Sequence, residues 1–538
     1  MAIRWLNAGK NSRLIIVLSI SLLVFFGRRG YCQEITKPGT GAADIRINQL
    51  GYYPDGPRKV AVVNTSSRIW TLLDTLGKRV YSGKLIPAGY CDKSGDTVKY
   101  ADMVYFSKPG IYQLYIPGKG PSQKFEIKPN LYREALRASL KSFYFQRASM
   151  PLEEKYAGLY ARPAGHPDDK CYFHPSSGKA SGSKPSPGGW YDAGDYNKYI
   201  VNSSITISMM LFLAELCPAA IPDGFCNIPE SGNGVSDLLD EVRYNINWML
   251  TMQDEDGGVF HKLTELGFGG FELPHKSKEK RYFVGKSTTA TLCFSASMAQ
   301  ASRIYRPYDP AFADRMLQAA EKAYQWALDN PDKFFSNPPD VHTGTYADQG
   351  ADDEFFWASA ELFRTTGDRN YRFGYRKYKK PIAFQPTENW RLYLRNLGYY
   401  TLILDKQNIP AEEREVLKKE MLVCADSLGL SMSVLPYRIP LTVFEWGSNS
   451  DILDAAMLFA IAWEQTKDKK YLNAMVETTD YIFGKNATGY CFVTGFGYKS
   501  PLNPHHRLSG GDGIAAPLPG FVVGGPNVVR QDAGNGAI

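Results

Sequence analysis

Cysteine is scarce in this chain, and its distribution excludes one class of fold. The 538 residues include 8 Cys, and no two cysteines form a CxxC pair. Their scatter, and the odd number that remains if cleavage removes Cys32, argue against a fold built on disulfides. A single disulfide between Cys217 and Cys226 stays open as an alternative for an oxidising compartment.

A run long enough to cross a bilayer is also missing. The longest apolar run, LIIVLSISLLVFF at 14–26, is too short for a comfortable span. Three basic residues precede it and small or polar residues follow it, which is the pattern of a signal peptide. We therefore predict a signal peptide over 1–32, a secreted or periplasmic protein, and no membrane span in the mature chain. The two arginines at 28 and 29 leave an uncleaved anchor as the alternative.

The net charge is small for a chain of this length. The formal net charge is +7, and the densest basic stretches are HKSKEKR at 275–281 and RKYKK at 376–380. Runs this short are typical of solvated loops, and no nucleic-acid motif accompanies them, so we expect no nucleic-acid partner. Aromatic residues, in contrast, are plentiful, with 34 Tyr, 28 Phe and 9 Trp. Aromatic rings fill cores, and they also stack on sugar rings.

The periodicity of apolar residues divides the chain into two regions. From 45 to 127, about seven short alternating runs are separated by turn sequences such as PDG, SGD and PGKG, which is typical of a β-sandwich. A polar, glycine-rich linker at 33–44 precedes them. From 131 to 500 the pattern predicts about ten helices and almost no strand. Two similar turns, TTGDRNY and QTKDKKY, each join a pair of helices, which favours a toroid or solenoid of helix pairs.

The densest set of reactive groups lies in PGGWYDAGDYNKY at 187–199. Asp192 and Asp195 are three residues apart around an Ala-Gly step, just before a predicted helix. This spacing can aim both carboxylates at one water, and each carboxylate raises the proton affinity of the other, which suits a general base. From spacing alone the alternative is structural, with Asp195 as the helix N-cap and Asp192 shaping the turn.

The segment GGWYDAGDYNKY resembles the nucleophilic-water motif of glycoside hydrolase family 9, the inverting endoglucanases. Five further segments fall in the family's order: IRINQLGYYPDGPRKVAVV (45–63), LLDEVRYNINWMLTMQ (238–253), DEFFWASAELFRTTGD (353–368), WGSNSDILDAAMLFA (446–460) and VTGFGYKSPLNPHHR (493–507). The first of them resembles the immunoglobulin-like module of one branch of the family. The resemblance implies a multidomain chain, an all-β immunoglobulin-like sandwich followed by an all-α (α/α)6 toroid.

The family's roles can be carried over to the matching residues of this chain. The second Asp of DAGD is the base and the first helps to hold the water, which implies these roles for Asp195 and Asp192. The family's HxR signature matches His505 and Arg507, which implies that both line the cleft and contact the sugar. A turn with surface charges is the alternative for that segment.

The candidates for stacking on the substrate are aromatic residues of these segments: Trp190, Tyr191, Trp248, Trp357 and Trp446. For each of them, the alternative is that the ring packs in the core of the domain.

The chemistry requires no cofactor, and two metal sites of the family are to be weighed. Asp353 and Glu354 begin a predicted helix, where the helix dipole favours acidic residues, and the family often binds calcium at the matching pair. We keep a structural calcium there as an expectation. Some members of the immunoglobulin-bearing branch hold a zinc, but the matching positions here are Ala148 and Gly165, with His166 left, so we expect no zinc.

The family's general acid is a Glu that follows NPHHR, and no Glu follows Glu477 in this sequence. An inverting mechanism needs a protonated carboxyl opposite the base, so we expect the catalytic domain at 131–538 to be truncated. The resemblance implies a monomeric endo-β-1,4-glucanase that cleaves internal bonds of cellulose or a related β-glucan with inversion. The alternatives are hydrolysis of xyloglucan or cello-oligosaccharides on the same fold, and a glycan-binding protein with impaired catalysis.

Overall fold

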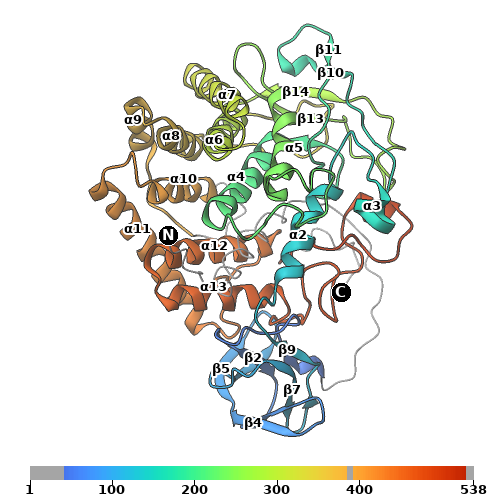
Figure 1. The fold of residues 1–538 in the computed structure, drawn as a ribbon, viewed down its shortest axis with the longest axis vertical. Helices are drawn as coiled ribbons and strands as arrows, with labels where there is room; N and C mark the ends of the chain where they lie inside the picture. Colours follow the sequence, from blue (N-terminus) through green and yellow to red (C-terminus); the bar gives the residue numbers. More distant parts are fainter. Residues whose placement is uncertain (1–41, 385–391, 529–538) are drawn as a thin grey trace.

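The computed structural model describes residues 42–384 and 392–528. The predicted signal peptide and most of the predicted linker lie outside these residues. The described part consists of a β-sandwich at one end and a large helical domain that packs on it (Figure 1).

Short antiparallel strands build the N-terminal sandwich. Its strands are β1 (Ile45–Arg46), β2 (Lys59–Val63), β3 (Ile69–Leu73), β4 (Arg79–Lys84), β5 (Ile86–Cys91), β6 (Asp96–Asp102), β7 (Gly110–Ile116), β8 (Gly120–Pro121) and β9 (Phe125–Ile127). One sheet has the order β1-β2-β6-β5 and the other β4-β3-β7-β8, with β9 also paired to β7. The predicted sandwich is confirmed, and the strands beyond the expected seven or so include two of only two residues each.

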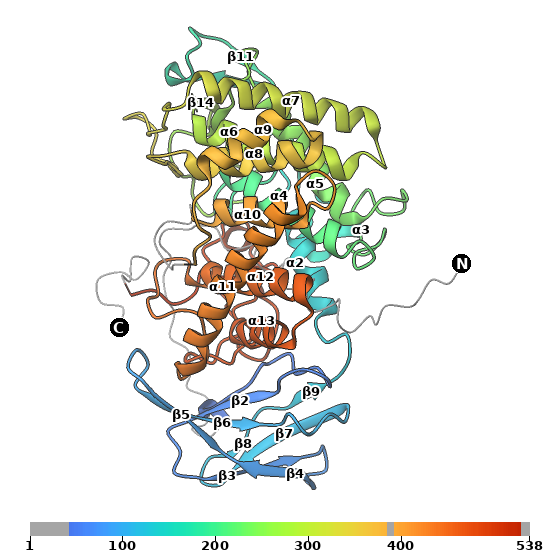
Figure 2. The ribbon, with the colours of Figure 1, turned by 90° about the vertical axis from the view of Figure 1, so that its left-hand side faces the viewer.

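The two sheets of the sandwich have different surroundings. In β2, Val60 and Val62 belong to the core of the sandwich, whereas Ala61 and Val63 belong to the core of the helical domain. Its sequence KVAVV is therefore an unbroken apolar run, as expected for a strand that is buried on both faces. β3, with the sequence IWTLL, alternates between buried and more exposed residues. The first sheet is thus a layer shared by both domains (Figure 2).

Polar contacts surround this shared apolar layer. Asn48 donates hydrogen bonds to the Asp480 carboxylate at 2.7 Å and to the Tyr132 hydroxyl at 2.6 Å. The Glu477 carboxylate pairs with Lys59 at 2.5 Å and with Arg438 at 2.6 Å. Glu477 is nearly buried, so these two cations compensate a charge that would otherwise be costly at the interface.

Long helices that follow one another in pairs build the second domain. The helices of ten or more residues in the described part are α2 (Arg133–Phe145), α4 (Ile200–Leu216), α5 (Asp237–Thr251), α6 (Thr288–Tyr305), α7 (Pro310–Asp329), α8 (Asp352–Thr366), α9 (Arg369–Tyr378), α10 (Leu392–Leu404), α11 (Ala411–Val434), α12 (Ser448–Thr466) and α13 (Lys469–Ile482). The short α3 (Glu154–Ala157) and α14 (Arg507–Gly511) lie in loops. From α4 to α13 each even-numbered helix packs against the helix that follows it (Figure 1).

Burial separates the helices of each pair. α4, α6, α8 and α12 are buried over most of their circumference, whereas α9 and α11 bury only one side. α4, α6, α8 and α10 also contact one another in series, which places them in an inner layer. The recurring pair predicted from the sequence is therefore present, with α4, α6, α8 and α10 as inner helices.

A small mixed sheet in the helical domain was not predicted, and the expectation of almost no strand after 131 was wrong here. It consists of β10 (Cys171–Phe173), β11 (Ser183–Lys184), β12 (Lys198–Tyr199), β13 (Phe260–Thr264) and β14 (Tyr282–Lys286), in the order β11-β10-β14-β13-β12. The β10–β14 pairing is parallel and the other pairings are antiparallel. Strands of two to five residues that are largely buried show no alternation, so periodicity cannot reveal them.

Seven cysteines lie in the described residues, and all of them are free thiols. Cys217 and Cys226 are therefore not bridged. Among the helices of the described ranges, none combines the length and the apolar character that a bilayer span requires.

Candidate active site

The two predicted carboxylates lie in a tight turn that leads into β12 and α4. The backbone N–H of Asp195 donates to the carbonyl of Asp192 at 2.8 Å. Ala193 has a φ of 35°, in the left-handed region. A Cβ on Gly194 would lie 2.2 Å from the carbonyl oxygen of His505. The small Ala-Gly step of the motif is therefore required because another segment packs directly on the turn.

Each carboxylate of the pair is held differently. Asp192 accepts hydrogen bonds on both oxygens, from the Asn202 side chain at 3.0 Å and from the Tyr346 hydroxyl at 2.5 Å. Asp195 accepts one from the backbone N–H of Asn197 at 2.6 Å. Two side-chain donors fix the orientation of Asp192, and Asp195 is positioned by the turn itself.

Burial dominates the electrostatics of this pair. Asp192 and Asp195 are only 8% and 9% exposed, and burial raises the pKa of both carboxyls. The charge of Asp192 raises the pKa of Asp195 further, while Arg507 acts in the opposite direction. Of the two carboxylates, Asp195 therefore binds a proton more readily, which is what a general base requires.

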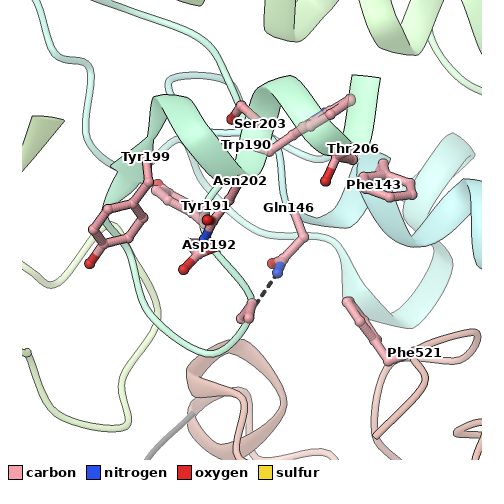
Figure 3. Close-up of a pocket in the computed structure, with 11 residues that line it drawn as sticks. Phe143, Gln146, Trp190, Tyr191, Asp192, Tyr199, Asn202, Ser203, Thr206 and Phe521 are labelled. Atoms are coloured by element: carbon pink, nitrogen blue, oxygen red, sulfur yellow. Dashed lines mark hydrogen bonds between the residues drawn. The ribbon is translucent and has the colours of Figure 1, made fainter. Parts of the chain in front are cut away.

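A cavity of about 60 Å³ lies beside Asp192, with Asn202 and Gln146 on its wall (Figure 3). Because a water needs roughly 10–15 Å³ of such volume, the cavity has room for water next to the carboxylate. Gln146 donates to the carbonyl of Ala193 at 2.7 Å, so a residue that follows α2 also supports the turn.

Two of the aromatic candidates, Trp190 and Tyr191, line the same cavity (Figure 3). Both are buried, and their polar atoms are engaged away from it. The indole N–H of Trp190 donates to Glu241 at 2.7 Å, and the hydroxyl of Tyr191 bonds the ring of His166 at 2.9 Å. Trp446 is partly buried just before α12, whereas Trp248 and Trp357 are fully buried in the core. Stacking of these rings on a sugar stays a prediction.

His505 and Arg507 pack against the turn that carries the carboxylates. The Arg507 guanidinium donates to the carbonyl of Gly194 at 2.7 Å and to that of Gly269 at 2.8 Å. The ring of His505 packs edge-on against Phe271 at 5.4 Å between centroids. The structure thus brings this segment to the predicted base, with Arg507 bracing the backbone. Contact of either residue with a sugar stays a prediction.

Tyr346 and Asn202 are site residues that the sequence analysis missed. Tyr346 lies more than 150 residues after Asp192, in a loop without periodicity. The one signal was its place just before the segment DEFFWASAELFRTTGD. Asn202 lies in α4, whose apolar composition hides the position of a single polar residue that faces the carboxylate.

The predicted calcium ligands lie in the first turn of α8. Glu354 is fully buried, and neither of its carboxylate oxygens accepts a hydrogen bond in the described residues. Burial, and then the charges of Asp353 and Asp348, raise its pKa well above the usual value. Uncompensated hard oxygen atoms of this kind suit a divalent cation. Within the described ranges, however, no three His, Cys, Asp or Glu side chains form a complete metal site, so backbone oxygens or water would have to supply further ligands.

Residues 132–535 match glycosyl hydrolase family 9, and residues 40–121 match the cellulase N-terminal ig-like domain. The chain therefore belongs to glycoside hydrolase family 9 and carries the immunoglobulin-like module that the sequence predicted.

Individual relatives cover almost the whole chain. A xyloglucan-specific endo-β-1,4-glucanase of Bacteroides ovatus is 41% identical over an alignment of 520 residues, which covers 91% of this chain and 86% of the relative. Endoglucanase D of Acetivibrio thermocellus is 34% identical over 489 residues, 89% of this chain and 77% of the relative. A solved Bacteroides ovatus family 9 structure superposes with a TM-score of 0.86 at 40% identity and covers 91% of this chain and 93% of that one.

A further solved structure is that of AaCel9A in complex with a cellobiose-like isofagomine. It superposes with a TM-score of 0.84 at 30% identity, over 91% of each chain. The chain is thus a glycoside hydrolase of the endoglucanase type, and its predicted architecture, a sandwich followed by an (α/α)6 barrel, is confirmed.

Proposed function

We propose that this protein cleaves internal β-1,4 bonds of a glucan with inversion of the anomeric carbon, and that Asp195 is the base. The observation that carries the proposal is the buried carboxylate pair in the DAGD turn of a family 9 fold. Burial and the neighbouring charge raise the pKa of Asp195, so that it can take a proton from water near neutral pH.

The roles of the two carboxylates follow from how they are held. We infer that Asp192, which is fixed by Tyr346 and Asn202, orients the attacking water. Asp195 removes the proton as the water attacks the anomeric carbon. A carboxylic acid on the other side of the scissile bond must protonate the leaving oxygen. Asp192 and Asp195 supply the base side of the reaction.

The stereochemistry tests this mechanism directly. Proton NMR during the first minutes of hydrolysis of a soluble cello-oligosaccharide should show the α anomer at the new reducing end before mutarotation. Appearance of the β anomer first would contradict the proposal. Binding of the oligosaccharide without any cleavage would instead favour the glycan-binding alternative.

Xyloglucan is the second candidate substrate, because the Bacteroides ovatus relative is specific for it. Initial rates on tamarind-type xyloglucan, on soluble cellulose derivatives and on cello-oligosaccharides distinguish xyloglucan from an unbranched β-glucan as the substrate. A rate on xyloglucan more than tenfold above the others would assign it as the substrate. A preference for short cello-oligosaccharides, with removal of sugars from one end, would contradict endo action.

We further propose that Asp353 and Glu354 bind a structural calcium, that the chain is exported, and that it acts as a monomer. The buried and uncompensated Glu354 carboxylate supports the calcium site. The basic start and the apolar run at 14–26 support export. Light scattering of the purified protein measures the oligomeric state.

A further inference from the structure

A buried lysine holds the loop that ends at Tyr346. Lys262 lies in β13 and is fully buried. Its amine donates to the side-chain oxygen of Asn337 at 2.7 Å, to the hydroxyl of Thr343 at 3.0 Å and to the carbonyl of Gly344 at 2.9 Å. Every hydrogen bond that the Lys262 amine makes with the described residues therefore goes to this one loop.

Neighbours of Lys262 in the same strand hold the same loop. The ring of His261 bonds the carbonyl of Thr345 at 2.9 Å, and the hydroxyl of Thr264 bonds that of Thr343 at 2.7 Å. β13 is paired with β12, which leads from the DAGD turn into α4. One strand therefore connects the loop 337–346 to the segment that carries the two carboxylates.

The far end of the loop is constrained at Tyr346. Its φ is 43°, a left-handed conformation that costs free energy for a residue other than glycine and persists only where the surroundings enforce it. A Cβ on Gly344 would lie 2.7 Å from the Tyr346 ring, and the Gly344 N–H donates to the hydroxyl of Tyr199 at 3.1 Å. In this conformation the Tyr346 hydroxyl reaches Asp192.

We propose that Lys262 is a positioning residue of the reaction, which acts by holding the loop 337–346 so that the Tyr346 hydroxyl stays on Asp192. The inference rests on the proposed function, because only there do Asp192 and Asp195 carry the chemistry. Lys262 itself bonds neither carboxylate. The other side-chain donor to Asp192, Asn202, comes from α4 and does not depend on this loop.

Loss of this hydrogen bond has an electrostatic signature. The Tyr346 hydrogen bond lowers the pKa of Asp192, so its loss should raise the proton affinity of the pair. Among the described residues, Lys262, Tyr199 and Arg507 also interact electrostatically with the pair. Because a base must be deprotonated, the acid limb of the kcat/KM profile should move to higher pH.

The experiment uses 2,4-dinitrophenyl β-cellobioside, whose phenolate leaves without a proton from the enzyme, so the rate reports on the base side alone. The variants are Lys262→Met, Lys262→Arg, Tyr346→Phe and the double variant Lys262→Met/Tyr346→Phe. Lys485→Met is the matched control, because Lys485 is another fully buried lysine and lies at the sandwich interface, beside Asp480. Melting temperature, kcat, KM and the pH profile are measured for each.

We expect Lys262→Met to lower kcat by up to about 100-fold, since a small misplacement of a catalytic group has an effect of this order. KM should stay near the wild-type value, and the acid limb should move in the direction seen for Tyr346→Phe. The double variant should be no worse than the more severe single variant, because both changes break the same contact. Lys262→Arg should recover part of the rate, and Lys485→Met should change only the melting temperature.

Two results would overturn the inference. One is a Lys262→Met enzyme with the wild-type kcat and pH profile, whatever its melting temperature. The other is a double variant whose loss is the full product of the two single losses. Failure of the proposed function looks different, because Asp195→Ala would then keep its turnover on the same substrate, whereas failure of this inference alone leaves Asp195→Ala inactive.

Discussion

Two segments approach the DAGD turn from elsewhere in the chain, and they hold it in different ways. The loop 337–346 reaches a reacting carboxylate, because the Tyr346 hydroxyl donates to Asp192. The segment 505–507 donates hydrogen bonds to the backbone of the turn, from Arg507 to the carbonyl of Gly194. The first contact is a hydrogen bond to a reacting carboxylate, whereas the second holds the backbone of the turn and brings the charge of Arg507 near Asp195. A change in the first should therefore alter the pH dependence of the enzyme, and a change in the second that keeps the charge of Arg507 should alter mainly the rate.

The largest effect is expected where both segments converge. Asp195→Ala removes the base itself and should lower kcat by roughly 10²–10⁴, the contribution of a positioned base. Initial rates on a soluble cellulose derivative measure it. Asp169→Ala is a suitable control, because Asp169 is an exposed carboxylate outside the site. A loss of tenfold or less would contradict the assignment of Asp195.

The next largest effect is expected from Gly194→Ala, which tests the positional contact. The new methyl group would lie 2.2 Å from the His505 carbonyl oxygen, so either the turn or the segment 505–507 must move. A displacement of this kind should lower kcat by about 100-fold, with a smaller shift of the acid limb than Tyr346→Phe causes. Gly267→Ala is the control, since a Cβ there meets nothing within 4 Å. Equal activity of the two variants would show that the close packing is not needed.

Arg507→Lys sharpens the same comparison with a smaller change. Lysine keeps the positive charge that lowers the pKa of Asp195, but it cannot bond the carbonyls of Gly194 and Gly269 with a planar fork. Loss of one such hydrogen bond corresponds to about a tenfold lower kcat. The pH profile should stay unchanged, and a shift of its acid limb would mean that Arg507 acts through charge geometry instead.

The smallest effect on the rate is expected from removal of calcium at the start of α8. This helix follows the loop 337–346, and its first turn carries Asp353 and Glu354. Calcium that binds only the folded state at 100 times its Kd would stabilise it by about 2.7 kcal/mol, so chelation should lower the melting temperature. Glu354→Gln should abolish this dependence on calcium. A melting temperature that is independent of calcium in the unaltered protein would contradict the metal proposal.

The features of the structure that the sequence predicts are those whose residues are close together in the sequence. The DAGD pair and its turn are local, and the alternating runs of the sandwich and the helix pairs follow from periodicity. Tyr346, Lys262 and the strand β13 were missed, because their roles arise from pairings between segments 60 or more residues apart. Nothing in FHKLT distinguishes a buried strand from an irregular loop until β12 and β14 are placed on either side of it.

The double burial of the first sandwich sheet has a consequence for how the molecule comes apart. Since β2 supplies side chains to two cores, detaching the sandwich would expose Ala61 and Val63 on one surface and their helical partners on the other. An apolar interface of this kind leaves no hinge for the module to swing on. Its detachment is therefore coupled to unfolding, so amide protons of β2 and α13 should exchange with solvent at similar slow rates. The sandwich is then an integral part of the fold of the helical domain and not an independent module.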